Sequence, residues 1–385
     1  MKILLDARLY GPENTGLGRY VMNLVENLVK IDRRNSYTIL LRKKYFDRLN
    51  FPPKWKKVLA DFRHYSFSEQ SRLPGMISQA KPHIVHFPHF NVPIFYSGKY
   101  VVTIHDILMH RQKGFEATTL NPVSYLFKRL GYKLIFGHAV RAATKVIVPS
   151  AFVKKEVSDY YKLDKDRVIV TYEGFDEKFL PAGAGLKVPR KYSLESPYFI
   201  YAGNAYPHKN LKRLIEAVVL LNQKQEKKVS LAIVSARNFF VSRLERLVKK
   251  MNAASYVKLL GFVSDAELGA LHLNSVAFVF PSLSEGFGLP GLEAMSVGTL
   301  VLASDIPVLK EVYKTYASYF NPYDYTSVEK AMEDAISIEP NVRREKIEKA
   351  REFAKRYSWD KMARETLKVY KQSLQDVPRK VKGIL

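Results

Sequence analysis

The hydrophobic pattern is most informative over residues 276–295. Residues 276–280 (Val-Ala-Phe-Val-Phe) contain no polar side chain, which predicts a parallel strand buried on both faces. Pro290 then predicts the first turn of a helix, because a missing N–H costs nothing there. The segment also carries three glycines that permit close approach to the backbone: Gly286, Gly288 and Gly291. We therefore expect a strand, a tight turn and a helix N-terminus, whose free N–H groups can hold a phosphate.

The same alternation of apolar strands and amphipathic helices recurs along the chain in two series. The first series has expected strands at residues 2–7, 37–41, 83–88, 100–106, 145–149 and 167–171. The second has expected strands at residues 198–203, 230–235, 257–264 and 276–280. Residues 181–190 between the two series have the Pro and Gly content of a linker. This order predicts an α/β protein with two Rossmann-like, doubly wound parallel-sheet domains.

Length and composition agree with this organisation. The 385 residues exceed the size of a single core, and we expect an N-terminal domain at residues 1–185 and a C-terminal domain at 186–358. With 47% hydrophobic and 26% charged residues, the chain is expected to be globular. It has no cysteine, which excludes disulfides and thiolate metal sites. No long apolar run or secretory signal is evident, so we expect a cytoplasmic chain, either free or peripheral at the inner face of the plasma membrane.

The chain is strongly basic, with 62 Lys and Arg against 37 Asp and Glu and a formal net charge of +25. This balance attracts anionic partners such as nucleotide diphosphates, lipid headgroups or nucleic acid. Residues 42–57 mix basic side chains with four aromatic ones: Tyr45, Phe46, Phe51 and Trp55. The mixture suits an anionic membrane surface or single-stranded nucleic acid, and a solvated protein surface is the plain alternative. We favour the membrane over nucleic acid.

Two carboxylates indicate what kind of phosphate ligand the central segment takes. Glu285 lies in the expected turn and Glu293 in the first turns of the expected helix, so both can point toward one crevice. Carboxylates accept hydrogen bonds from hydroxyl groups, and a nucleotide sugar offers hydroxyls on both its ribose and its hexose. The alternative is that Glu293 interacts with the helix dipole and Glu285 is a solvated loop charge. Together with the glycines and Pro290, the pair favours a ligand.

Further candidates lie where expected strands lead into loops. Gly16 and Gly18 follow the first strand and open a helix, although they lack the full dinucleotide-binding motif. His105 ends a central strand, where it can bind a sugar hydroxyl or remain a core histidine bonded to the backbone. Lys209 stands at a helix entry, where it can contact phosphate oxygens or remain a surface lysine.

Residues 281–295 closely resemble the paired-glutamate signature of retaining glycosyltransferases with the GT-B fold, in the large family 4 that includes many bacterial mannosyltransferases. In that family the first glutamate contacts hydroxyl groups of the transferred sugar, and the second contacts the ribose of the nucleotide. The resemblance implies these roles for Glu285 and Glu293. It also implies donor contacts along the adjoining turn: Gly286, Phe287, Gly288 and Leu289.

The resemblance covers nearly the whole chain and implies roles in the N-terminal domain. Gly16 and Gly18 resemble the glycine loop that lies over the donor diphosphate and the acceptor. His105 matches the histidine that the family places beside the donor sugar.

In the C-terminal domain, Lys209 matches the family's diphosphate-binding lysine. Asn204 stands where many members carry an arginine, so a second cation on the diphosphate is in doubt. The base pocket of the family is formed near the strand ends that hold Ser235, Phe262 and Val263 here, often through backbone groups.

The resemblance implies a GT-B architecture with an interdomain cleft and a C-terminal helix, residues 359–376, that crosses back onto the first domain. It implies hexose transfer from a nucleotide diphosphate sugar to a hydroxyl group, with retention of configuration and without metal or cofactor. GDP-mannose is the favoured donor, UDP-sugars are the alternative, and the acceptor is expected to be a glycan or lipid-linked glycan. We expect Glu285, His105 and Lys209 to carry the chemistry. A GT-B epimerase or phosphorylase and a basic nucleic-acid-binding protein are the competing readings.

Overall fold

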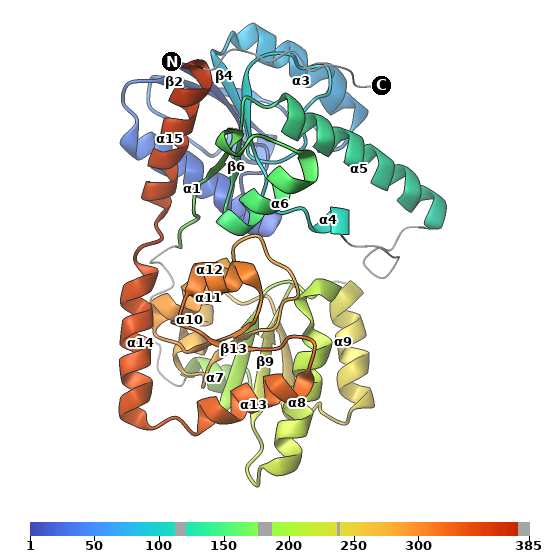
Figure 1. The fold of residues 1–385 in the computed structure, drawn as a ribbon, viewed down its shortest axis with the longest axis vertical. Helices are drawn as coiled ribbons and strands as arrows, with labels where there is room; N and C mark the ends of the chain where they lie inside the picture. Colours follow the sequence, from blue (N-terminus) through green and yellow to red (C-terminus); the bar gives the residue numbers. More distant parts are fainter. Residues whose placement is uncertain (112–120, 176–186, 237–238, 376–385) are drawn as a thin grey trace. The chain divides into compact units, whose positions relative to one another are not determined.

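The computed structural model describes residues 1–111, 121–175, 187–236 and 239–375, which form two compact units (Figure 1). The first unit contains Met1–Gly174 together with Ser358–Leu385, and the second contains Phe175–Tyr357. The domain boundary expected between residues 185 and 186 lies outside the described residues.

The first unit is built on a seven-stranded parallel sheet in the order β3-β2-β1-β4-β5-β6-β7. Its strands are β1 (Lys2–Asp6), β2 (Ser36–Leu41), β3 (Trp55–Leu59), β4 (Ile84–Phe87), β5 (Tyr100–Thr103), β6 (Lys145–Val148) and β7 (Val168–Val170). Its helices are α1 (Thr15–Ile31), α2 (Lys43–Phe46), α3 (Phe67–Ala80), α4 (Leu108–Arg111), α5 (Pro122–Ala142), α6 (Ala151–Tyr161) and α15 (Trp359–Gln375). Short 3-10 turns occur at η1 (Pro12–Asn14) and η2 (Lys165–Arg167).

The second unit has a six-stranded parallel sheet in the order β10-β9-β8-β11-β12-β13. Its strands are β8 (Tyr198–Ala202), β9 (Ser230–Val234), β10 (Val257–Gly261), β11 (Phe278–Phe280), β12 (Val301–Ser304) and β13 (Ser318–Phe320). Its helices are α7 (Lys187–Lys191), α8 (Leu211–Lys224), α9 (Phe239–Lys250), α10 (Asp265–Leu273), α11 (Leu289–Val297), α12 (Pro307–Tyr313), α13 (Tyr325–Ile336) and α14 (Pro340–Ala354), with a 3-10 turn η4 (Pro207–Lys209).

Local sequence signals account for many of these boundaries. Strands β8, β9 and β11 are buried along their whole length, as their uninterrupted apolar residues predict. Helices α6 and α10 begin after Ser150 and Ser264, whose side chains accept a hydrogen bond from the backbone N–H three residues on. Ser358 accepts a hydrogen bond from the Lys361 N–H at 3.2 Å and caps α15 in the same way. Each of these three helices therefore begins at a serine N-cap.

The final helix belongs to the first unit, as the resemblance implied. Helix α15 packs against α1 and contacts β4, β5 and β6. Its buried Tyr370 hydroxyl lies 2.7 Å from Nδ1 of His86 in β4. Met362 is also fully buried on this side of the helix. The last described segment of the chain therefore contributes core packing and a buried hydrogen bond to the N-terminal sheet.

The order of strands reverses within each sheet. In the second unit the chain runs from β8 outward to β9 and β10, and β11 then pairs with the other side of β8. A crevice forms at such a reversal, beyond the carboxyl ends of the strands, and it is where open α/β sheets bind ligands. The loops after β8 and β11 flank this point.

Residues 42–57 are more structured than their composition suggested. They include α2, and their last residues enter β3, which pairs with β2. The Trp55 ring is buried and stacks on Tyr37 with 3.9 Å between ring centroids, and Phe51 stacks on Trp55. Lys57 donates to the backbone carbonyls of Phe46 and Leu49 at 2.7 and 2.8 Å. Trp55 is therefore part of the packing of this segment, whereas Tyr45, Phe46 and Phe51 are only partly buried.

Among the helices of the described ranges, none combines the length and apolar character needed to cross a bilayer.

Candidate functional site

The turn between β11 and α11 is shaped by a tyrosine from the next helix. The buried Tyr313 hydroxyl, at the end of α12, donates a hydrogen bond to the carbonyl of Gly288. Gly288 has a φ of 105°, a conformation that favours glycine, and it forms the N-cap of α11. A Cβ atom at Gly291 would lie 2.3 Å from the Tyr313 hydroxyl oxygen. Two of the three glycines therefore make room for Tyr313, a partner that the sequence pattern did not reveal.

Lys209 and Glu285 meet at the reversal of strand order. The Lys209 Nζ atom lies 2.6 Å from Glu285 Oε1, and the two side chains are only 13% and 12% exposed. Lys209 comes from η4 after β8, and Glu285 comes from the turn after β11, so neighbouring strands deliver the two charges. An ammonium group has three N–H donors, and the contact with Glu285 uses one of them. The pair thus combines a cation suited to phosphate with a carboxylate suited to hydroxyl groups.

Backbone and amide hydrogen bonds hold the two loops together. The Leu283 N–H donates to the His208 carbonyl at 2.8 Å. The buried Asn210 side chain donates to the carbonyls of Pro281 and Pro322 at 3.0 and 2.7 Å. These bonds fix the backbone on both sides of the ion pair. The geometry of Lys209 against Glu285 is therefore part of the folded unit rather than a contact between two free side chains.

Neighbouring titratable groups are neutral at pH 7. Burial, with a smaller repulsion from Lys209, lowers the pKa of His208 to about 4. Burial, reinforced by the negative charge of Glu285, raises the pKa of Tyr201 well above its ordinary value. Tyr201 therefore remains a hydroxyl, which donates to the Asn204 carbonyl at 2.7 Å. His208 and Tyr201 are therefore uncharged beside the contact between Lys209 and Glu285.

Glu293 lies in α11 and is buried. The pKa of Tyr313 is raised well above its usual range, chiefly by burial and then by the charges of Glu285 and Glu293. Both carboxylates are therefore within electrostatic range of one tyrosine hydroxyl. This places the two predicted acids around a common structural element.

The remaining predicted donor residues of this unit follow adjacent strands. Ser235 comes directly after β9, and Phe262 and Val263 come directly after β10. The strand order β10-β9-β8-β11 therefore sets the predicted residues side by side along one sheet edge. Ser235 and Ser282, the latter in the turn after β11, are buried, and their hydroxyl groups have no hydrogen-bond partner within the described ranges of the chain. Two unpartnered buried hydroxyls at this edge are available to a polar ligand.

Several predicted side chains turn out to support the loops themselves. Asn204 accepts a hydrogen bond from the Tyr206 N–H at 3.4 Å, so its side chain shapes the loop after β8. Phe287 is buried and makes an edge contact with Tyr357, with 5.6 Å between ring centroids. Gly286 and Leu289 are partly exposed at the turn. Phe262 is 85% exposed, whereas Val263 is buried.

In the first unit, the predicted glycines lie inside the first turn of α1 rather than in a loop before it. Gly18 is buried, and a Cβ atom there would lie 1.9 Å from the Gly11 carbonyl oxygen. Gly16 is exposed, and nothing lies within 4 Å of its would-be Cβ atom. Gly18 therefore has a packing role, and Gly16 leaves open space beside the start of the helix.

His105 follows β5, and each of its two ring nitrogens contacts an oxygen atom of another residue. Its Nδ1 lies 3.1 Å from a carboxylate oxygen of Glu173, and its Nε2 lies 3.1 Å from the Pro88 carbonyl oxygen. The Tyr20 ring of α1 contacts it edge-on, with 4.7 Å between centroids. Both ring nitrogens of His105 therefore lie within hydrogen-bond distance of an oxygen atom, which fixes the orientation of the ring. Glu173, which follows β7, is a functional candidate whose role the sequence did not indicate.

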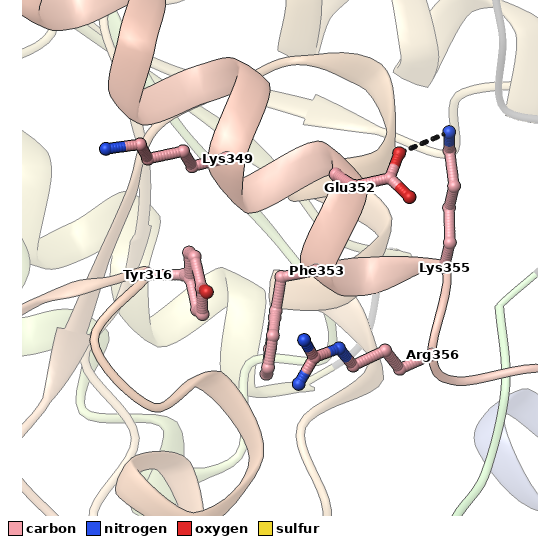
Figure 2. A pocket seen from close by; sticks show the side chains of 6 residues that line it. All are labelled: Tyr316, Lys349, Glu352, Phe353, Lys355 and Arg356. Atoms are coloured by element: carbon pink, nitrogen blue, oxygen red, sulfur yellow. Dashed lines mark hydrogen bonds and ion pairs between the residues drawn. The ribbon is translucent and has the colours of Figure 1, made fainter.

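A hollow of about 390 Å³ lies elsewhere in the second unit, beside the end of α14 (Figure 2). It is lined by Tyr316, Lys349, Glu352, Phe353, Lys355 and Arg356. Phe353 stacks on Tyr316 with 4.2 Å between ring centroids, and Lys355 pairs with Glu352 at 2.6 Å. None of the predicted site residues lines this hollow, so its size does not make it the reactive centre.

The fold and the sheet edge together define the class: a two-unit, doubly wound α/β protein with a cation and carboxylates at the strand reversal of its second sheet. Residues 14–179 match the family model described as Glycosyltransferase Family 4, and residues 187–353 match the model described as Glycosyl transferases group 1. The chain belongs to the GT-B glycosyltransferases, and the fold class expected from the sequence is confirmed.

Individual proteins are also similar to this chain over almost its whole length. O-antigen chain mannosyltransferase B of Escherichia coli is 27% identical over 394 residues, covering 96% of this chain and 100% of that protein. The solved sucrose-phosphate synthase of Thermosynechococcus elongatus has a TM-score of 0.76 at 18% identity and covers 97% of this chain and 98% of its own. Anabaena Alr3699/HepE in complex with UDP and glucose has a TM-score of 0.73 at 17% identity and covers 97% and 100%. The two structural likenesses concern the fold alone.

Proposed function

We propose that this glycosyltransferase moves a mannosyl residue from GDP-mannose to a hydroxyl group of a glycan or lipid-linked glycan, with retention of anomeric configuration. The observation that carries the proposal is the Lys209–Glu285 pair at the strand reversal of the second unit. Mannose is favoured because the Escherichia coli relative that spans the whole chain is described as a mannosyltransferase.

The proposed role of Lys209 is electrostatic. When the bond between the anomeric carbon and the diphosphate oxygen breaks, the electron pair stays on the diphosphate. Lys209 and the N–H groups at the start of α11 then stabilise the growing negative charge. The loops around Lys209 are already tied by hydrogen bonds, so little reorganisation is needed at the moment of reaction. This preorganisation is the main contribution we assign to the protein.

The proposed role of Glu285 is to hold the sugar. Its carboxylate accepts hydrogen bonds from hexose hydroxyl groups, while Glu293 accepts them from the ribose. Glu285 contacts Lys209, so the donor enters between two groups whose opposite charges already balance each other. We propose that the acceptor oxygen attacks the anomeric carbon on the face that the diphosphate leaves. The acceptor proton passes to the departing diphosphate, and no covalent enzyme intermediate forms.

His105 is proposed to bind a hydroxyl group of the donor sugar. In this proposal Glu173 keeps its contact with Nδ1 and Tyr20 contacts the ring, while Nε2 exchanges the Pro88 carbonyl for the sugar hydroxyl. Transfer without a metal ion is part of the proposal, since the charge on the diphosphate is met by Lys209 and by backbone N–H groups.

A nucleotide screen tests the donor assignment. We expect GDP to raise the unfolding temperature of the full-length chain more than UDP or ADP at equal concentration, because a ligand stabilises the folded state that it binds. GDP-mannose should then be consumed with transfer to an added glycan acceptor. A larger rise in unfolding temperature with UDP would contradict GDP-mannose as the donor and would favour a UDP-sugar. No shift with any nucleoside diphosphate would contradict donor binding at this edge.

A further inference from the structure

Helix α5 presents an apolar face to solvent in the first unit. Four large side chains remain exposed on it, at 66%, 72%, 56% and 55% of their surface: Leu126, Phe127, Leu130 and Leu134. At 3.6 residues per turn these positions fall within an arc of about 100°. An exposed contiguous stripe of this kind is unusual on a solvated helix and marks an interaction surface.

The opposite face of α5 holds the helix in its unit. Tyr132, Phe136, Ala139 and Val140 are buried in the core of the first sheet. In Figure 1 the amino-terminal half of the helix extends away from that sheet. The exposed stripe is therefore not needed for packing the unit, and it stays uncovered in the part of the chain that the structure describes.

The charge of α5 selects the kind of partner. The helix contains no Asp or Glu and four basic residues: Lys128, Arg129, Lys133 and Arg141. A second copy of the chain docked α5 to α5 would bring eight of these cations together (2 × 4). An anionic lipid surface instead complements both the charge and the apolar stripe, as in helices that lie in a membrane interface.

A small hollow continues the stripe toward the carboxyl end of α5. It has a volume of about 80 Å³ and is lined by Lys133, Leu134, Gly137, His138 and Arg141. Both ring nitrogens of His138 are buried there, and neither has a hydrogen-bond partner among the residues that the structure describes. Two cations and an unpartnered imidazole beside a glycine suit the oxygens of a phosphate group.

We propose that α5 is a membrane-docking helix, which seats its apolar stripe among the headgroups of an anionic bilayer and places Lys128, Lys133 and Arg141 against lipid phosphates. This role goes beyond sugar transfer and is independent of the donor. The proposal assigns membrane docking to α5 rather than to residues 42–57, where Trp55 is buried and stacked on Tyr37.

Vesicle co-sedimentation of the full-length chain tests the proposal. We expect binding to equimolar phosphatidylglycerol and phosphatidylcholine vesicles, little binding to phosphatidylcholine alone, and release as salt is raised. Lys128→Gln/Lys133→Gln should lower the partition coefficient by about 30-fold, at about 1 kcal/mol per basic residue. Leu126→Gln/Phe127→Gln/Leu130→Gln should lower it at least about tenfold, because the stripe no longer gains from leaving water.

The control is Lys368→Gln/Lys371→Gln, which removes the same charge from exposed positions of α15 in the same unit. It should leave binding within about twofold, since charges away from the contact are screened. All variants should keep the wild-type unfolding temperature and the wild-type response to GDP, which separates docking from the donor site. Equal loss in the control, unchanged binding by both α5 variants, or a dimer that only the α5 variants dissociate would overturn the proposal.

Discussion

At the scale of single residues, two of the predicted site residues are held by partners that orient their side chains. Glu285 and His105 were expected from the sequence, but each is held by another charged side chain. Glu285 contacts Lys209 at 2.6 Å, and His105 contacts Glu173 at 3.1 Å. The role of Glu173 could not be predicted because it follows β7 whereas His105 follows β5, and only the strand order brings the two together. Long-range pairs of this kind leave no local pattern.

Glu173→Gln should lower kcat by about 10- to 100-fold with little change in KM for the donor, because the amide holds the His105 ring less firmly. Steady-state kinetics of the purified chain measure both parameters. Glu245→Gln, at an exposed position of α9, is the matched control and should behave as wild type. If kcat is unchanged in Glu173→Gln, the contact with His105 has no part in turnover.

At the scale of secondary structure, the strand, turn and helix of the β11–turn–α11 segment could be predicted from the sequence. The packing role of its glycines could not. The apolar strand and the proline at the helix start are local signals, and both are found. Gly288 and Gly291, however, accommodate Tyr313 from α12, which lies one strand and one helix further along the chain. Sequence reasoning assigned both glycines to a ligand because that partner is distant in sequence.

Gly291→Ala should destabilise the chain by about 1–3 kcal/mol, because the new methyl group overlaps the Tyr313 ring. Chemical unfolding measures the loss. In a double-mutant cycle with Tyr313→Leu, the combined loss should be smaller than the sum of the single losses, since the shorter side chain vacates the space. Strict additivity would count against this packing.

Gly75→Ala in α3 is the control for this substitution. Nothing lies within 4 Å of the added Cβ atom, so the change should be neutral or stabilising by about 0.5–1 kcal/mol through helix propensity. A loss at Gly75 equal to that at Gly291 would show that an added methyl group lowers stability even without the Tyr313 contact, and would contradict the packing role of Gly291.

At the scale of the whole molecule, alternation of strands and helices was enough to predict two doubly wound units. The topology confirms it, with a parallel sheet in each unit and a strand reversal where the predicted donor residues gather. The surface was harder to predict. Residues 42–57 read as an exposed basic and aromatic patch, yet Trp55 is buried in stacking contacts and its neighbours enter β3.

In helix α5 it was the exposed face, rather than a buried one, that the sequence did not predict. Its sequence is apolar on two faces, and only the fold reveals that Tyr132 and Phe136 face the core while Leu126 and Leu130 remain in water. Hydrophobic periodicity identifies an apolar face but does not say what covers it. The docking surface therefore became visible only when the packing of the whole first unit was known.

The most direct test of donor handling at the Lys209–Glu285 edge compares Glu285→Gln with Lys209→Gln, since each removes one charge from the same contact. Sugar transfer and GDP binding are measured on both variants, with the unfolding temperature as a control for folding. We predict that Glu285→Gln loses about 100-fold or more in turnover yet still binds GDP, whereas Lys209→Gln loses affinity for GDP as well. Wild-type turnover in Glu285→Gln would contradict the account.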